Sequence, residues 1–297
     1  MFERIFGVYL IRKGKLSKEQ MAILQKPGDH SRVKLGVIAV AEKFMTQQEA
    51  DEVNRLQSIT DRRFGDIAIE KGYLNEAQVE SLIKRQGNAF LHFLQSVIEE
   101  GFYTLDELDG FISDYQEEMG FTQSDMDDLL SGDILREVGV YMPGKNTISD
   151  GLMGVAVRTF LRLIDSGAYV GKAYFTDELS SDRFTSQTMT GDHHMVTGFA
   201  GDGDDLLCVA NVFAGEEFEE VDLDALDAVA EFVNCVDGMY AAALSNESVN
   251  VDMLPPEYYD SKVKIKGNQF LVLPVVSGDS QVALVVSVDN ELTVDKN

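Results

Sequence analysis

The first third of the chain repeats every 29 residues. Glycines recur at this interval, at positions 7, 36 and 65. Five apolar columns keep the same register over four units, and they start at Leu10, Ile11, Leu16, Met21 and Leu24. A unit of this length cannot bury its own apolar face, so such units stack on their neighbours. The repeat therefore predicts an array of similar units.

Helix-capping residues follow the same register. Each unit has a capping residue followed three residues later by Gln or Glu, and the caps are Ser17, Thr46, Asn75 and Thr104. This is the capping box, which satisfies free N–H groups at a helix start. A glycine precedes three of the caps, where a helix ends and the chain turns, and Lys43 replaces it in the second unit. We expect each unit to be a short helix, a turn and a capped helix, and residues 1–130 to form an all-α domain with an acidic connector.

The second and third units resemble the tandem motif of the MshEN domain, found at the N-terminus of type II secretion and type IV pilus ATPases. They read KLGVIAVAEKFMTQQEADEVNRLQ and RFGDIAIEKGYLNEAQVESLIKRQ. In some family members the tandem motif binds cyclic di-GMP. The resemblance covers roughly residues 1–110, and it implies a ligand site at Lys34, Gly36, Gln57, Arg63, Gly65 and Gln86.

The second unit departs from this motif, with Lys34 in place of Arg, Lys43 in place of Gly and Ala50 in place of Leu. An arginine at the motif start suits stacking on a guanine and a fork of hydrogen bonds. Two interpretations stay open. The repeats either bind cyclic di-GMP, or they keep the scaffold without the ligand and bind a partner protein.

Charge is unevenly distributed over a chain with a formal net charge of −26. Residues 1–100 carry 15 Lys and Arg against 14 Asp and Glu, whereas residues 101–297 carry 10 against 37. The acidic part repels nucleic-acid phosphates and anionic membranes, so we expect neither as a partner, although the charge equally suits a role in solubility. Cys208 and Cys235 give neither a disulfide framework nor a metal quartet. Without a long apolar run or a secretory signal, we expect a cytoplasmic protein that has no metal site.

In the second half, the order of predicted elements is helix, strands, helix, strands. Helices are predicted at residues 148–164 and 223–244, the second with Asp222 as its N-cap. Strands are predicted at residues 185–190, 194–199, 206–213, 270–276 and 282–288. Such segregation indicates an α+β domain over residues 131–297, with helices on one face of an antiparallel sheet.

The second predicted helix carries a polar stripe beside its apolar one. At 100° per residue, Asp227, Glu231, Asn234 and Gly238 fall within about 60° of each other. Glu231 and Asn234 are one turn apart, so their side chains point the same way. Gly238 has no side chain and lets another surface approach closely. The stripe is a candidate contact surface, and the alternative is an ordinary solvated helix face.

This stripe resembles the Asp/Ser-xxx-Glu-xx-Asn signature that CheX, CheC and FliY proteins share. Asp227, Glu231 and Asn234 fit its spacing, and Pro255 or Pro256 follows where these proteins have a proline. A single signature is typical of CheX, whereas CheC carries two. The resemblance covers roughly residues 145–297 and implies a CheX-like α+β domain with an antiparallel sheet and two long helices.

The resemblance also implies a chemotaxis-type phosphatase that removes the phosphoryl group from the aspartyl phosphate of a CheY-type receiver. Asn234 would position the hydrolytic water, Glu231 would pair with the receiver's lysine, and Asp227 and Gly238 would contact the receiver. The receiver supplies Mg²⁺, so no cofactor of the protein's own is implied. Domains with one signature are similar to known homodimers whose subunits join through their sheets. Residues 282–288 are a candidate edge strand for such a dimer. The alternative is a non-catalytic signalling adaptor that binds a partner protein or cyclic di-GMP.

Overall fold

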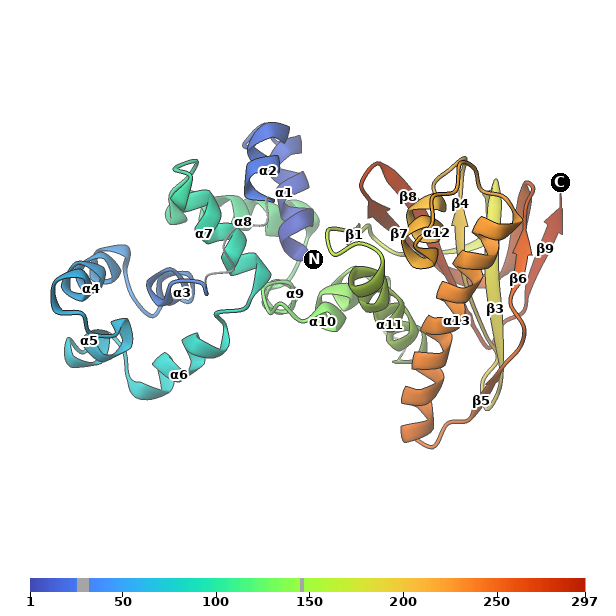
Figure 1. Ribbon diagram of the computed structural model, residues 1–297. Helices are drawn as coiled ribbons and strands as arrows, with labels where there is room; N and C mark the ends of the chain where they lie inside the picture. Colours follow the sequence, from blue (N-terminus) through green and yellow to red (C-terminus); the bar gives the residue numbers. More distant parts are fainter. Residues whose placement is uncertain (26–31, 145–146, 297) are drawn as a thin grey trace. The chain divides into compact units, whose positions relative to one another are not determined.

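The computed structural model describes residues 1–25, 32–144 and 147–296. These residues form two compact units, one of Phe2–Gly132 and one that begins at Asp133 and includes Met1. In Figure 1 the described part of the first unit, from blue to teal, contains helices without strands, whereas the second, from green to red, combines helices with a sheet.

The described part of the first unit contains one helix pair for each 29-residue repeat. The pairs are α1 (Phe2–Arg12) with α2 (Lys18–Leu24), α3 (Leu35–Ala41) with α4 (Gln47–Thr60), α5 (Phe64–Glu70) with α6 (Glu76–Lys84), and α7 (Ala89–Glu99) with α8 (Leu105–Met119). A further helix, α9 (Gln123–Leu129), lies in the predicted acidic connector. The organisation predicted from the repeat is confirmed.

The predicted capping boxes form in all four units. Each cap side chain accepts a hydrogen bond from the third backbone N–H of its helix, and the Gln or Glu at that position accepts one from the backbone N–H of the cap. The cap residues are Ser17, Thr46, Asn75 and Thr104. Each box satisfies N–H groups that the helix itself leaves without partners.

The turn before each cap has a left-handed residue. The φ angles are +66° at Gly14, +75° at Gly72 and +70° at Gly101, and Lys43 takes the same place with φ of +59°. A residue with a Cβ meets a steric penalty there of roughly 1–2 kcal/mol, because the Cβ approaches the following carbonyl oxygen. Lys43 therefore keeps the turn geometry of the repeat at a local energetic cost.

The second unit combines four helices of the described chain with one antiparallel sheet. The helices are α10 (Ile134–Val140), α11 (Thr147–Leu163), α12 (Leu207–Ala214) and α13 (Leu223–Asn246). The strands are β1 (Tyr169–Val170), β2 (Tyr174–Ser181), β3 (Arg183–Gly191), β4 (Met195–Gly201), β5 (Val251–Met253), β6 (Glu257–Tyr259), β7 (Val263–Ser277), β8 (Ser280–Val288) and β9 (Leu292–Lys296). Neighbouring strands follow the order β1-β7-β8-β4-β3-β5, with β2 and β9 on β7 and β6 on β3.

Helices α11 and α13 lie against one face of this sheet (Figure 1). Between them, Phe160 of α11, Phe199 of β4 and Phe232 of α13 contact one another with ring centroids 5.6 to 6.1 Å apart. A second buried cluster forms where the sheet curls over itself, and it includes Phe184 of β3 and Ile265 of β7. The predicted α+β class, with long helices on an antiparallel sheet, is confirmed.

One predicted strand is wrong, because in the run 206–213 the residues after Leu206 lie in α12 instead. This helix ends at Gly215, which has a left-handed φ of +69°. The run is apolar without alternation, and periodicity alone cannot separate a buried strand from a buried helix in such a run. Phe213 contacts Phe232 edge-on, with 5.5 Å between ring centroids. The helical conformation of this run therefore packs against α13.

The proposed sheet edge at residues 282–288 is also wrong. These residues lie in β8, which pairs with β7 on one side and with β4 on the other. The backbone groups of an interior strand are already used in two ladders, so this run offers no edge to a second copy of the chain.

Candidate functional site

Helix α13 presents the predicted polar stripe on an accessible face. The Asp222 side chain caps it by accepting a hydrogen bond of 2.9 Å from the backbone N–H three residues on. Apolar side chains then bury the opposite face of the helix, which leaves Asp227 and Glu231 exposed and Asn234 and Gly238 partly buried. The four predicted residues therefore lie along one side of a single helix of 24 residues.

The Asn234 amide is hydrogen-bonded on its buried side by a residue that the sequence did not indicate. Its Oδ1 accepts a hydrogen bond of 3.0 Å from Nε2 of Gln187, and the same nitrogen donates to the Leu254 carbonyl oxygen at 2.8 Å. Gln187 lies on β3 and is only 3% exposed. The Leu254 carbonyl lies directly before Pro255 and Pro256, either of which can match the proline of the signature, so Gln187 ties the signature helix to the proline segment.

Sequence reasoning missed Gln187 because its partners are distant along the chain. Asn234 lies 47 residues away and Leu254 67 residues away. The local pattern around Gln187 is that of a strand with alternating faces, and the sole local signal is a large amide on a face otherwise suited to burial. The two prolines mark the segment that contains Leu254, but they do not indicate which side chain hydrogen-bonds to the Leu254 carbonyl.

Exposed apolar side chains border the polar stripe. Met253, Leu254 and Tyr258 are 41%, 45% and 42% exposed, and they belong to the segment of β5 and β6 that contacts α13. A Cβ added to Gly238 would meet Met253 Cε at an ordinary 3.8 Å, so the methionine already lies against the open glycine. A carboxylate, an amide and an apolar border together are typical of a surface that binds another protein.

A second group of polar side chains lies beneath α13 and is fully enclosed. Asp237 is 0% exposed, and burial raises the pKa of its carboxyl to about 7, although the Thr197 hydroxyl lowers it by a smaller amount. Neither carboxylate oxygen has a hydrogen bond of regular geometry, and the same holds for the hydroxyls of Thr185 and Thr197 and for Gln187 Oε1. Asp237 has no surface exposed to a partner protein, so it lies outside the accessible site.

The residues of the proposed cyclic di-GMP site are partly engaged within the first unit. Lys34 donates through its ammonium to Glu99 Oε1 at 2.7 Å, and Gln86 Nε2 donates to the Val33 carbonyl at 2.7 Å. Gln57 and Arg63 are exposed. Lys34 is also exposed in its ion pair, so three side chains of the predicted set are accessible, and two of the set, Lys34 and Gln86, have partners within the domain.

The two motif glycines are buried by helix packing. A Cβ added to Gly65 would lie 2.8 Å from Cγ1 of Val79, and one added to Gly36 would lie 3.1 Å from the Phe64 ring. The absence of a side chain lets α6 approach α5 of the same repeat at Gly65, and lets α5 of the next repeat approach α3 at Gly36. Packing within the repeat is a sufficient reason for these glycines.

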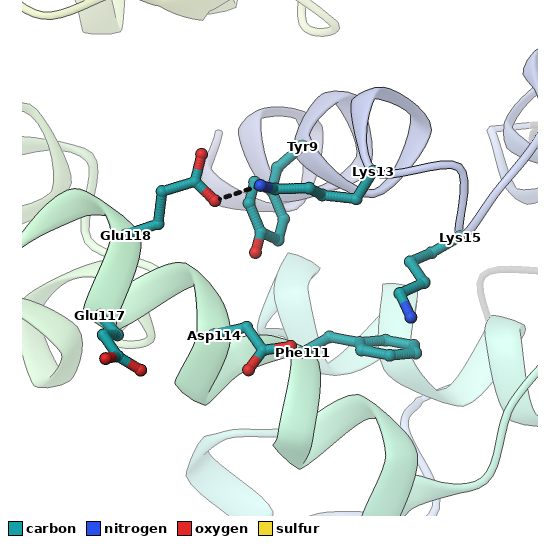
Figure 2. A pocket seen from close by; sticks show the side chains of 7 residues that line it. All are labelled: Tyr9, Lys13, Lys15, Phe111, Asp114, Glu117 and Glu118. Carbon is teal, nitrogen blue, oxygen red and sulfur yellow. Dashed lines mark ion pairs between the residues drawn. The ribbon is translucent and has the colours of Figure 1, made fainter.

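A groove of the first unit lies between α1 and α8, away from the motif residues. Figure 2 shows Lys15 above the Phe111 ring and Lys13 directed at Glu118. The ammonium of Lys15 is 4.7 Å from the ring centroid, and that of Lys13 is 2.7 Å from the carboxylate. Asp114 and Glu117 also line the groove of about 340 Å³. Three carboxylates against two ammonium groups make it a poor site for the phosphates of a dinucleotide.

Within the described residues, no three His, Cys, Asp or Glu side chains lie close enough to hold a metal ion. His193 is paired with Asp289, at 2.9 Å between Nδ1 and Oδ2. The helices in the described part of the chain are all too short or too polar to cross a membrane.

Solved structures of chemotaxis proteins are similar to about half of this chain. A CheC-like superfamily protein from Shewanella sp. PV-4 matches with 18% identity and a TM-score of 0.42, over 48% of this chain and 99% of that one. CheX from Desulfovibrio desulfuricans matches with 15% identity and a TM-score of 0.42, over 48% and 99%. CheX from Borrelia burgdorferi, solved with CheY, BeF₃ and Mg²⁺, matches with 15% identity and a TM-score of 0.40, over 51% and 100%. No protein-family model and no curated protein matches the sequence.

Proposed function

We propose that the second unit is a phosphatase that hydrolyses the aspartyl phosphate of a CheY-type receiver domain. The observation that carries the proposal is the pair on α13, where the exposed carboxylate of Glu231 precedes by one turn the Asn234 amide, anchored by Gln187. The spacing of Asp227, Glu231 and Asn234 resembles the signature of the CheX, CheC and FliY phosphatases, which supports the same reaction.

The chemistry requires positioning more than activation. In the reaction, the water oxygen bonds to phosphorus, the bond to the aspartyl oxygen breaks, and inorganic phosphate and the receiver's carboxylate are released. The receiver contributes Mg²⁺ and a lysine, so the phosphatase has to hold a water in line with the breaking bond. A neutral amide such as Asn234 can hydrogen-bond this water without repelling the phosphoryl oxygens.

Glu231 has the properties of an anchor for the receiver. Its carboxylate is exposed, so it can form a charge-assisted contact with the receiver's lysine when the two proteins meet. The apolar border of Met253, Leu254 and Tyr258 adds contact area beside the polar stripe. Gly238 leaves room for the receiver's backbone, and Asp227 extends the acidic end of the contact.

For the first unit we propose a helical docking module that binds a partner protein rather than cyclic di-GMP. The ammonium of Lys34 forms an exposed ion pair with Glu99, and Gln86 donates a partly buried hydrogen bond to the backbone of Val33. The packing of Gly36 and Gly65 also accounts for the motif glycines without a ligand. The adaptor role thus belongs to the first unit and the phosphatase role to the second.

The test is phosphate release from receivers. All receiver domains of the source genome would be phosphorylated with acetyl phosphate, freed of the excess, and followed with and without the full-length protein. We expect the cognate receiver to lose its phosphate at least about tenfold faster with the protein, and the Glu231→Ala, Asn234→Ala double variant to abolish the gain. If the wild-type protein accelerates none of them, the second unit is not a phosphatase.

A further inference from the structure

Gln187 has an unusual position for an amide, because it lies beneath the helix that carries the proposed site. It is 3% exposed, on the face of β3 that α13 covers, and it pairs across the strands with Thr197 of β4. Its Nε2 reaches two acceptors, Asn234 Oδ1 at 3.0 Å and the Leu254 carbonyl at 2.8 Å. The backbone N–H of Leu254 in turn donates to the Thr188 carbonyl at 2.8 Å, which ties the same segment to β3.

These contacts fix which way the Asn234 amide points. A backbone carbonyl only accepts hydrogen bonds, so the Gln187 atom that faces Leu254 must be the nitrogen. That nitrogen only donates, so the Asn234 atom that faces it must be the oxygen. Nδ2 of Asn234 is therefore the amide group that points away from Gln187, and it has no hydrogen-bond partner among the described residues.

Gln187 brings a cost to stability as well as a benefit. Its Oε1 is buried without a hydrogen-bond partner, which is unfavourable, and an apolar side chain of similar shape would avoid that penalty. The same side chain also serves the Leu254 carbonyl, in a hydrogen bond that is partly buried. A donor at this position achieves two things that an apolar side chain cannot: it satisfies the Leu254 carbonyl and it fixes the Asn234 amide.

We propose that Gln187 is a positioning residue that makes Asn234 a hydrogen-bond donor to the attacking water. The proposal rests on the phosphatase function proposed above. Nδ2 donates to one lone pair of the water oxygen, which leaves the other lone pair directed at phosphorus. Without Gln187, the Asn234 amide can rotate and present its oxygen, and the water is then held in the wrong orientation for part of the time.

The first test separates turnover from binding with Gln187→Met, which keeps the length of the side chain and removes the donor. We expect kcat on the cognate phosphorylated receiver to fall about tenfold, while KM stays within about twofold, because Glu231 is untouched and the Leu254 N–H still ties the apolar border to the Thr188 carbonyl. Thr185→Val is the matched control, since Thr185 lies on the same face of β3, is 0% exposed and has no partner for its hydroxyl. This control should keep the wild-type kcat.

Two further variants keep the test decisive. Asn234→Asp preserves the shape of the side chain but replaces the outward Nδ2 donor with a charged oxygen that only accepts. We therefore expect this variant to be as slow as Asn234→Ala. A near wild-type rate for Asn234→Asp would overturn the donor role. If Gln187→Met does not fold, Gln187→Glu retains the shape, and its carboxylate cannot donate to both acceptors, so the same loss of kcat is expected.

A measurement without the receiver tests the hydrogen bonds themselves. In NMR spectra of the full-length protein, the side-chain amide protons of Gln187 should exchange with solvent at least about 100-fold more slowly than those of exposed Gln57, because they are buried and bonded. Equal exchange rates would overturn the proposal. If every receiver is unaffected by the wild-type protein, the phosphatase function fails and the catalytic role of Gln187 fails with it. If the wild type is active and folded Gln187→Met has the same kcat, the positioning role alone fails.

Discussion

Glu231 and Asn234 lie one turn apart on the same face of α13, but the structure restrains them differently. The Glu231 side chain is exposed, whereas the Asn234 amide is held by Gln187 at 3.0 Å. A restrained amide suits a task that depends on direction, such as holding a water in line. An exposed carboxylate on a flexible stem suits a task that depends on reach, such as pairing with a lysine of another protein.

Asn234→Ala should therefore reduce the chemical step selectively. We expect single-turnover dephosphorylation of the cognate receiver to slow by about 100-fold, or about 3 kcal/mol, which is typical of deleting one positioned polar group. Binding of the phosphorylated receiver should change by less than about threefold. Cys235→Ala, at the next position of the same helix, is the control and should turn over at the wild-type rate. An equal loss of binding and rate would instead make Asn234 a docking residue.

Glu231→Ala should weaken the complex as well as the rate. The variant loses a charge-assisted contact between the proteins, so we expect the dissociation constant to rise about tenfold or more. Added salt should weaken wild-type binding more than binding of the variant, because screening acts on the charge that the variant lacks. Calorimetry at two salt concentrations measures both effects. Asp279→Ala, in the exposed turn between β7 and β8, is the control and should bind as the wild type does.

The sequence predicted those features that depend on neighbouring residues. The 29-residue spacing and the capping boxes set the helix pairs, and Asp222 set the start of α13, because a cap acts within one turn of its helix. Residues 206–213 failed for the opposite reason. An apolar run without alternation is decided by what it packs against, and here Phe213 meets Phe232 of α13.

The candidate site likewise has one part that depends on neighbouring residues and one part that depends on tertiary packing. The stripe of Asp227, Glu231 and Asn234 follows from helical spacing, so it could be named before the fold. Gln187 and the Leu254 carbonyl could not, since they reach Asn234 only after β3 and the proline segment come together under α13. The short strands β5 and β6 that carry this segment have three residues each, too few for an alternating pattern to stand out.

The left-handed turn of the second repeat predicts a stabilising substitution. Lys43→Gly should raise the local unfolding free energy by about 1 kcal/mol, because glycine adopts a φ of +59° without the Cβ clash. The salt bridge of Lys43 with Asp109 is long, at 3.6 Å between exposed groups, so its loss should matter little. Hydrogen exchange of the α3 and α4 amides measures the change. Gly72→Ala, at the matching turn of the third repeat, should shift α5 and α6 in the opposite direction.

Cyclic di-GMP should not bind the first unit. Titration of the full-length protein at ligand concentrations well above the micromolar range should release no heat, since Lys34 and Gln86 already bond within the unit. Arg63→Ala should give the same flat titration. Heat in the wild type that disappears in Arg63→Ala would restore the interpretation based on the tandem motif and contradict the docking role proposed for these helices.

Asp237→Asn tests the enclosed carboxyl beneath α13. Burial raises the pKa of this carboxyl in the folded state from its ordinary value of about 4 to about 7, so between these pH values the folded state holds a proton that the unfolded state has already released. The stability from this group is therefore complete below about pH 4 and is lost as pH rises through about 7, by a few kcal/mol in total. Asparagine resembles the protonated acid and has no such dependence. We expect Asp237→Asn to match the wild type near pH 4 in denaturant unfolding and to be the more stable protein at pH 8.

The difference between the two stability curves isolates Asp237 from other carboxyls. Asp182 and Asp289 have pKa values lowered in the fold, so they add stability as pH rises, but they contribute equally to both proteins and cancel in the difference. Parallel curves for the wild type and Asp237→Asn would mean that the buried carboxylate stays ionised at neutral pH. It would then need a partner that satisfies the charge beneath the helix carrying Glu231 and Asn234.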